Sequence, residues 1–157
     1  RRGGAILRGF SLSESDVAAF LKQPWTATTT DAWIVRPGDD IGRAHPRAYG
    51  SFPRKIRRYA LDEKLISVEQ AIRSCSGLPA EILELQDRGR LQVGAHADLV
   101  VLDLDRIADR STFFDPHQMS QGVLHVFVSG VAIVENEHIT GATPGKVLLN
   151  PKRKKVD

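Results

Sequence analysis

The hydrophobic pattern predicts a short helix near the start of the chain and an extended segment after it. Val17, Phe20 and Leu21 recur at the spacing of one helix face, so residues 14–22 are predicted to form an amphipathic helix. A serine and two acidic residues open this segment, as is typical of a helix start. Residues 25–30 are mostly β-branched or aromatic, which favours a strand.

A long stretch without a regular period follows, over residues 32–53. It contains three prolines and three glycines and is predicted to be a loop. Loops of this length in compact domains are usually functional or disordered. A helical period returns at residues 54–63. It returns again after Ser67, where we expect a helix that Gly77 ends, and then a further turn over residues 80–85.

From Gly89 onward the apolar period is two. Ser129 and Gly130 separate two apolar runs and predict a tight hairpin turn. Strands are predicted over residues 90–93, 97–104 (a buried strand), 123–128, 131–135 and, as one more, 141–149. The elements therefore divide into a strand–loop–helix part over residues 1–88 and an antiparallel β part over residues 89–150.

Composition and charge narrow the class of protein. The 157 residues carry a net charge of +3, and a basic tail over residues 151–157 is predicted to be disordered. A basic patch without interleaved aromatic residues favours only nonspecific, salt-sensitive contact, so no specific nucleic-acid partner is expected. Cys75 is the one cysteine, which excludes an internal disulfide. No apolar run reaches the ~20 residues of a membrane span, and no signal peptide is visible, so we expect a cytoplasmic protein.

Asp31 is the first candidate for chemistry. It follows the predicted strand over residues 25–30 and precedes a polar loop. Catalytic residues of α/β barrels commonly occupy that position at the carboxyl end of a strand. An aspartate that forms a turn or caps a helix would show the same local pattern. The local sequence leaves both interpretations open.

The motif His45-Pro46-Arg47-Ala48-Tyr49-Gly50-Ser51-Phe52-Pro53 is the second candidate. Arg47 offers a planar fork that binds a carboxylate through two parallel hydrogen bonds. Tyr49 and His45 add polar groups on a stretch stiffened by proline. Such a motif suits capture of a small anionic molecule. The alternative is that Arg47 pairs with a surface carboxylate.

The other histidines carry less information. His96, His117, His125 and His138 show neither His-x-His nor His-Glu-x-x-His spacing. We therefore predict them to be surface or core imidazoles rather than a metal site.

These motifs resemble the D-aminoacylase (N-acyl-D-amino-acid deacylase) branch of the amidohydrolase superfamily. The motif that starts at His45 points most specifically to this branch. Further stretches agree in order along the chain: residues 15–17, 23–25, 30–31, 77–83, 87–89, 97–103, 114–118, 128–130 and 141–145.

The resemblance implies an α/β fold: the last strand, active-site loop and closing helices of a metal-dependent (β/α)8 barrel, followed by half of a small β-sandwich. It implies a hydrolase of linear amide C–N bonds that converts an N-acyl-D-amino acid to a carboxylate and a free D-amino acid, with zinc as cofactor. It implies that Asp31 lies at the metal, as a possible ligand, and shuttles the proton of the attacking water. Arg47 matches the arginine that binds the substrate's α-carboxylate, with His45 and Tyr49 as neighbours.

Two departures from the family pattern matter. Thr30-Asp31-Ala32 replaces the usual Ser-Asp-Gly, and the stretch between Asp31 and His45 looks longer. A complete barrel also needs roughly 250 residues, so the other metal ligands would lie upstream. We expect this chain to be inactive alone and to work with an upstream barrel portion or with itself as an oligomer. The alternative is a non-catalytic scaffold or interaction module derived from an amidohydrolase.

Overall fold

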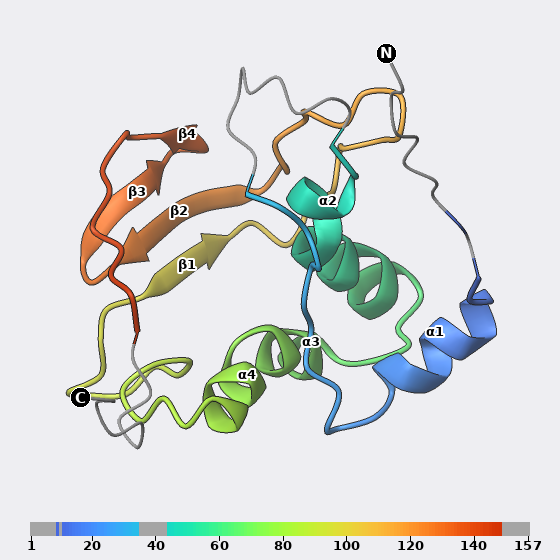
Figure 1. Cartoon of the computed structure of the whole chain (residues 1–157), viewed down its shortest axis with the longest axis horizontal. Coiled ribbons are helices and arrows are strands. Elements are labelled where there is room, and N and C mark those ends of the chain that lie inside the picture. Colours follow the sequence, from blue (N-terminus) through green and yellow to red (C-terminus); the bar gives the residue numbers. More distant parts are fainter. Residues whose placement is uncertain (1–8, 10, 35–43, 149–157) are drawn as a thin grey trace, which may run out of the picture.

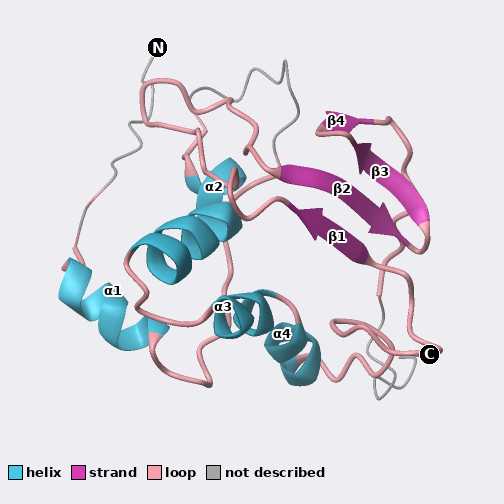
Figure 2. Ribbon diagram, turned by 180° about the vertical axis from the view of Figure 1, so that it is seen from behind, coloured by secondary structure: helices cyan, strands magenta, loops and turns pink. Residues whose placement is uncertain are grey.

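The computed structural model describes residues 9, 11–34 and 44–148, in which helices lie on one side and a four-stranded antiparallel sheet on the other (Figures 1 and 2). The predicted basic tail and residues 35–43 of the predicted loop lie outside the described residues. The order is α1 (Glu14–Leu21), α2 (Arg47–Arg54), the π-helical η1 (Lys55–Asp62), α3 (Val68–Cys75), α4 (Gly77–Ile82), β1 (Leu99–Leu102), β2 (Val123–Val128), β3 (Val131–Glu135) and β4 (His138–Ile139).

The first helix begins as the sequence predicts. The Ser13 side chain accepts a hydrogen bond from the Asp16 backbone N–H, and the Asp16 carboxylate accepts one from the Ser13 N–H in return. This capping box satisfies two N–H groups that an α-helix cannot satisfy itself. The Ser13 hydrogen bonds also lower the pKa of the Asp16 carboxyl. The prediction of a helix over residues 14–22 is confirmed, with its last residue one earlier.

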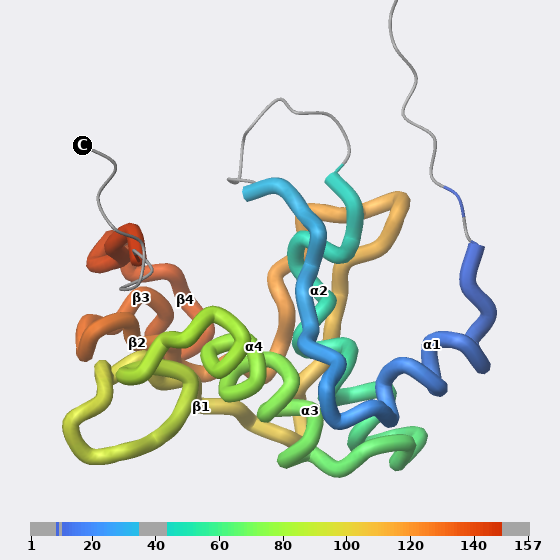
Figure 3. Tube along the Cα trace, turned by 60° about the horizontal axis from the view of Figure 1, so that its bottom comes forward, coloured from blue at the N-terminus to red at the C-terminus, as the bar shows by residue number. Residues whose placement is uncertain are grey.

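The predicted strand over residues 25–30 is absent from the structure. A strand is stabilised by hydrogen bonds to a neighbouring strand, whereas the Thr28 N–H here donates to the Ser74 carbonyl of α3 at 2.8 Å. The segment crosses the helices and rises toward α2 (Figure 3). The composition that favours a strand is present, but no partner strand lies beside it among the described residues.

The predicted loop is wrong from Arg47 onward, because α2 starts there and continues into η1. Pro46 supplies the backbone angle that a helix start needs and has no N–H to satisfy. Pro53 lies inside α2 and cannot bond the Tyr49 carbonyl four residues earlier. The Ser120 hydroxyl donates to that carbonyl instead, at 2.8 Å. A long helical segment therefore tolerates an internal proline.

The helices α3 and α4 follow with one correction. Ser67 caps α3 through the Gln70 N–H at 3.1 Å, as predicted. Gly77 does not end this helix but is the first residue of α4, after Ser76 breaks the helical geometry. The buried core lies between η1, α3 and the segment after β1, and its residues are Ile56, Ala60, Ile66, Ala71 and Ile107.

The sheet has the order β1-β2-β3-β4, each pair antiparallel. The hairpin between β2 and β3 is confirmed, and its turn residues Ser129 and Gly130 both have positive φ, as a two-residue type I′ turn requires. The predicted buried strand over residues 97–104 shortens to β1, whose central residues are exposed. No strand forms at residues 90–93. The predicted last strand over 141–149 is replaced by the short β4, within the part that the structure describes.

No helix among the described residues is long and apolar enough to cross a membrane. Several large apolar side chains are nevertheless exposed, in the segment over residues 25–34 and on the β part. Those surfaces bear on how the chain is completed, because isolated soluble domains seldom expose many large apolar groups together.

Candidate active site around Asp31 and Arg47

Asp31 and Arg47 lie together although 15 residues separate them in the sequence. The Arg47 Nη2 is 3.1 Å from the Asp31 Oδ2. The Asp31 side chain is 84% exposed and that of Arg47 40%, so the carboxylate is open to a ligand or a further protein surface. The sequence left open whether Arg47 binds a ligand or pairs with a surface carboxylate. Here Arg47 does pair with an exposed carboxylate, and that carboxylate is the other candidate residue, Asp31.

The backbone turns sharply at Asp31, where φ is +46°. Aspartate adopts this left-handed region more readily than most residues. The Asp31 N–H donates to the Thr29 hydroxyl and the Ala32 N–H to the Thr30 hydroxyl, at 3.5 and 3.3 Å. These two contacts within residues 29–32, rather than a strand end, accompany the turn of the backbone at Asp31.

Arg47 stands in the first turn of α2. Its backbone N–H donates to the His45 Nδ1 at 3.1 Å, so His45 satisfies one of the free donors at the helix start. One edge of its guanidinium faces Asp31, while its Nε is buried and has no hydrogen-bond partner among the described residues. An unpaired buried donor is costly.

Tyr49 and His45 contact a loop of the β part rather than Asp31. The Tyr49 hydroxyl lies 3.0 Å from the His117 Nδ1. The His45 ring meets the Phe113 ring edge-on, with centroids 5.0 Å apart. Positions two apart on a helix do not face each other, which is why Tyr49 and Arg47 point to different neighbours.

His117 is a residue that the histidine spacing missed. Its only signal in the sequence was its place in the Phe114-Asp115-Pro116-His117-Gln118 stretch, which carried no role. A contact over 68 positions with Tyr49 cannot be read from local pattern.

The segment that leads to Asp31 is tied to the helices by polar groups. The buried Lys55 ammonium donates to the Thr28 hydroxyl at 2.7 Å. That hydroxyl lies 3.3 Å from the Ser74 hydroxyl, which in turn donates to the Ala71 carbonyl at 2.7 Å. Burial lowers the pKa of Lys55. This chain of contacts fixes the segment three residues before Asp31.

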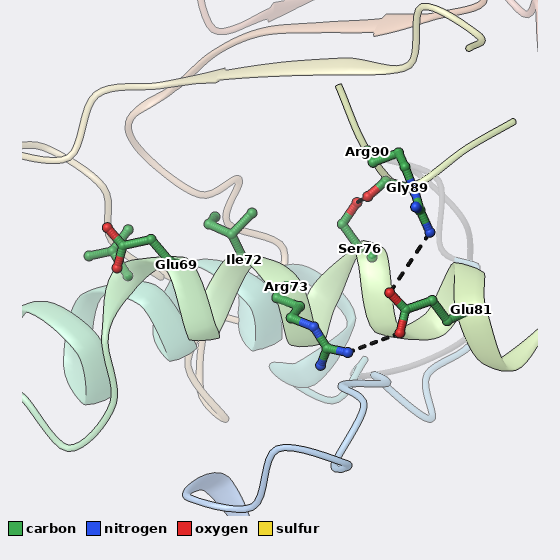
Figure 4. Close-up of a pocket in the computed structure, with 9 residues that line it drawn as sticks. Glu69, Ile72, Arg73, Ser76, Glu81, Gly89 and Arg90 are labelled. Atoms are coloured by element: carbon green, nitrogen blue, oxygen red, sulfur yellow. Dashed lines mark hydrogen bonds and ion pairs between the residues drawn. The ribbon is translucent and has the colours of Figure 1, made fainter. Parts of the chain in front are cut away.

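Among residues 9, 11–34 and 44–148, no three His, Cys, Asp or Glu side chains gather where they could hold a metal. An open hollow lies instead on α3 and α4 (Figure 4), at the other end of the helical part from α2. Glu81 stands at its rim between two guanidinium groups, 2.9 Å from Arg73 and 3.8 Å from Arg90. This hollow does not contain the Asp31–Arg47 pair.

The sequence of this chain matches the family model described as "Amidohydrolase family" over residues 3–134. The chain belongs to the amidohydrolase family. It is 37% identical over 145 residues to the N-acyl-D-glutamate deacylase of Alcaligenes xylosoxydans xylosoxydans, an alignment that covers 92% of this chain and 28% of that protein. This amidohydrolase chain therefore spans just over a quarter of the length of that relative.

Two solved amidohydrolase structures resemble the fold. A D-aminoacylase described as defining a novel subset of amidohydrolases matches with a TM-score of 0.76 and 37% identity, over 83% of this chain and 27% of the other. The N-acyl-D-glutamate deacylase of Bordetella bronchiseptica, complexed with zinc and a phosphonate inhibitor, matches with 0.71 and 37%, over 78% and 25%. The recognised family resemblance is confirmed. The identity is 37% to both proteins, so it does not indicate which of their substrates this chain's enzyme would prefer.

Proposed function

We propose that this amidohydrolase chain is the carboxy-terminal part of a zinc-dependent deacylase that hydrolyses N-acyl-D-amino acids to a carboxylate and a free D-amino acid. The relatives named above are called N-acyl-D-glutamate deacylase and D-aminoacylase, and these names describe enzymes that act on such substrates. The observation that carries the proposal is the Asp31–Arg47 pair, 3.1 Å apart. It puts a carboxylate that can move a proton beside a cation that can hold a carboxylate.

Asp31 fits a metal as one ligand of several. Its carboxylate is a hard oxygen donor of the kind that zinc accepts, and its 84% exposure leaves it open toward the rest of a site. When bound, zinc lowers the pKa of a water and polarises the scissile carbonyl. No three candidate ligands gather among the described residues, so the remaining ligands would come from the upstream part of the enzyme.

The two side chains have separate roles. Asp31 takes a proton from the attacking water and returns one to the leaving amine, which general acid–base catalysis requires. Arg47 binds the α-carboxylate of the substrate through its planar fork. The Arg47 side chain is 40% exposed, so its guanidinium can meet a ligand that arrives from solvent.

The organisation of the whole enzyme is part of the proposal. Residues 1–88 would close a (β/α)8 barrel, and residues 89–150 would form half of a β-sandwich. A barrel strand over residues 25–30 would form only when a neighbouring strand lies beside it. The upstream barrel portion, or another copy of the chain, would supply that neighbour.

The test is Asp31→Asn in the complete zinc-loaded enzyme. Asparagine keeps the shape and the turn but cannot carry the proton, so kcat should fall by at least ~10²-fold while the melting temperature stays near that of the parent. Asp105→Asn, at an exposed aspartate in the turn after β1, is the matched control and should leave kcat unchanged.

Full activity of the Asp31→Asn variant would remove Asp31 from the reaction. Absence of turnover by the parent enzyme on a panel of N-acetyl-D-amino acids would instead favour the alternative, a non-catalytic scaffold that keeps the amidohydrolase pattern.

A further inference from the structure

Residues 109–120 form a loop that is held in one shape by its own hydrogen bonds. Ala108 and Gln121 close its base as an antiparallel bridge, with N–H···O distances of 3.2 and 2.9 Å. Inside the loop, the buried Ser111 hydroxyl donates to the Pro116 carbonyl at 2.6 Å. The Thr112 N–H donates to the Asp115 carbonyl at 3.0 Å. A loop with so many internal bonds behaves as a rigid unit rather than as a flexible connection.

This 109–120 loop lies beside α2 in both Figure 1 and Figure 3. Its contacts run along the helix. His117 meets the Tyr49 hydroxyl at 3.0 Å, and Ser120 donates to the Tyr49 carbonyl at 2.8 Å. Phe113 packs against His45, directly before the helix. The contacts join groups from two regions of the chain that are predicted to belong to different domains.

At Gly50 the 109–120 loop lies so close to the helix that a side chain would not fit. A Cβ at this position would stand 2.9 Å from the Asp109 Cβ, closer than real Cβ atoms come. Asp109 also binds Arg54 of the same helix, at 3.0 Å from its Nη1. Glycine is therefore required here because the loop and the helix backbone touch, although glycine disfavours a helix.

We propose that the 109–120 loop is a positioning element that sets the place of Arg47 by holding α2. The helix carries Arg47 in its first turn, and the loop contacts reach from His45 to Arg54 on either side of it. Since a bidentate carboxylate contact depends on the position of the fork, a small shift of α2 weakens substrate binding. The β part thereby takes part in the active site without touching the substrate. This inference rests on the proposed function of Arg47.

Gly50→Ala in the complete enzyme is the deciding variant. Alanine favours a helix over glycine, so any loss must come from the contact with Asp109. We expect KM to rise about tenfold, because a shift of α2 displaces Arg47 from the substrate carboxylate. The change in kcat should be much smaller. Asp109→Gly in the same chain removes the clashing Cβ and should restore most of the KM. Gly145→Ala, where nothing lies within 4 Å of the new Cβ, is the control.

Two readouts separate the possibilities. The positioning role would be overturned if Gly50→Ala lowers stability but leaves the KM of the folded enzyme unchanged. It would also be overturned if the KM of the double variant is no closer to that of Asp109→Gly alone than the KM of Gly50→Ala is to that of the parent. Hydrogen exchange of the α2 amides tests the loop–helix contact without any activity: exchange should accelerate in Gly50→Ala and slow again in the double variant. If the parent enzyme hydrolyses no N-acyl-D-amino acid but this exchange pattern holds, the proposed function fails while the loop still holds the helix.

Discussion

Arg47 is the residue in which the two functions of the candidate site meet. Its Nη2 faces Asp31 at 3.1 Å, and its buried Nε–H has no partner among the described residues. A substrate carboxylate would compete with Asp31 for the same guanidinium. Binding of the substrate would then leave the Asp31 carboxylate free for the proton.

Replacing Arg47 with lysine tests this geometry. Lysine keeps the charge but has neither the planar fork nor the Nε–H. In the complete enzyme, Arg47→Lys should raise KM by about tenfold, equal to about 1.4 kcal/mol, for N-acyl-D-amino acids. Steady-state kinetics measure the effect. Arg57→Lys, at an arginine paired with Asp62 in η1, is the control. Unchanged kinetics in Arg47→Lys would exclude Arg47 from carboxylate binding.

The residue types of this site could be read from the sequence, but their partners could not. Asp31 and Arg47 stood out because a carboxylate followed an extended segment and an arginine lay in a proline-bounded motif. Their pairing depends on how the chain returns from residue 31 to residue 47, and no local pattern encodes that path. His117 had no such mark, since its relation to Tyr49 arises only from packing.

At the level of elements, the predictions from local propensity failed where contacts with distant parts of the chain determine the structure. Residues 47–53, predicted as a loop, lie in α2, where Ser120 satisfies the carbonyl that Pro53 leaves unpaired. Residues 25–30 have strand composition but bond to α3 through Thr28. By contrast, the start of α1 and the hairpin at Ser129 were predictable, because a cap and a two-residue turn are specified by adjacent residues.

Lys55 shows how the extended segment is attached to the helices. It is 4% exposed and donates to Thr28. Burial lowers its pKa below the ordinary lysine value of about 10.4. Between the lowered pKa and that value, the unfolded chain binds more protons than the folded chain, so this group makes stability rise with pH. At lower pH both states are charged, and the full cost of burying the charge is present.

Lys55→Met should therefore be least harmful at neutral pH. Methionine keeps the apolar stem and removes the charge, but it gives up the bond to Thr28. The free energy of unfolding of the parent minus that of the variant should increase as pH rises toward about 10.4. Urea denaturation at several pH values measures this difference, and Lys22→Met at the exposed end of α1 is the control. A difference that is constant or falls with pH would contradict the assignment.

The molecule as a whole exposes apolar surface that a complete amidohydrolase would cover. In the segment before residue 35, Trp25, Trp33 and Ile34 are 70%, 86% and 94% exposed. In the β part, strand β1 lies at an edge of the sheet with Val100 exposed. Unpaired edges and large apolar groups both seek partners. This chain covers 28% of the length of the Alcaligenes deacylase. That share agrees with an exposed apolar surface that further protein covers in the complete enzyme.

The chain expressed by itself should consequently self-associate and show no deacylase activity. Size-exclusion chromatography with light scattering should give a mass above the 17.3 kDa of one chain. The double substitution Trp33→Ser and Ile34→Ser should lower that mass, because it removes the most exposed apolar pair from the segment next to Asp31. Phe114→Ser, which changes one equally exposed aromatic residue in the 109–120 loop, should have a smaller effect, since an isolated apolar side chain drives little association. A monomeric chain that hydrolyses an N-acetyl-D-amino acid would contradict both expectations, because one exposed carboxylate and one arginine would then suffice for a reaction that we assign to the assembled barrel.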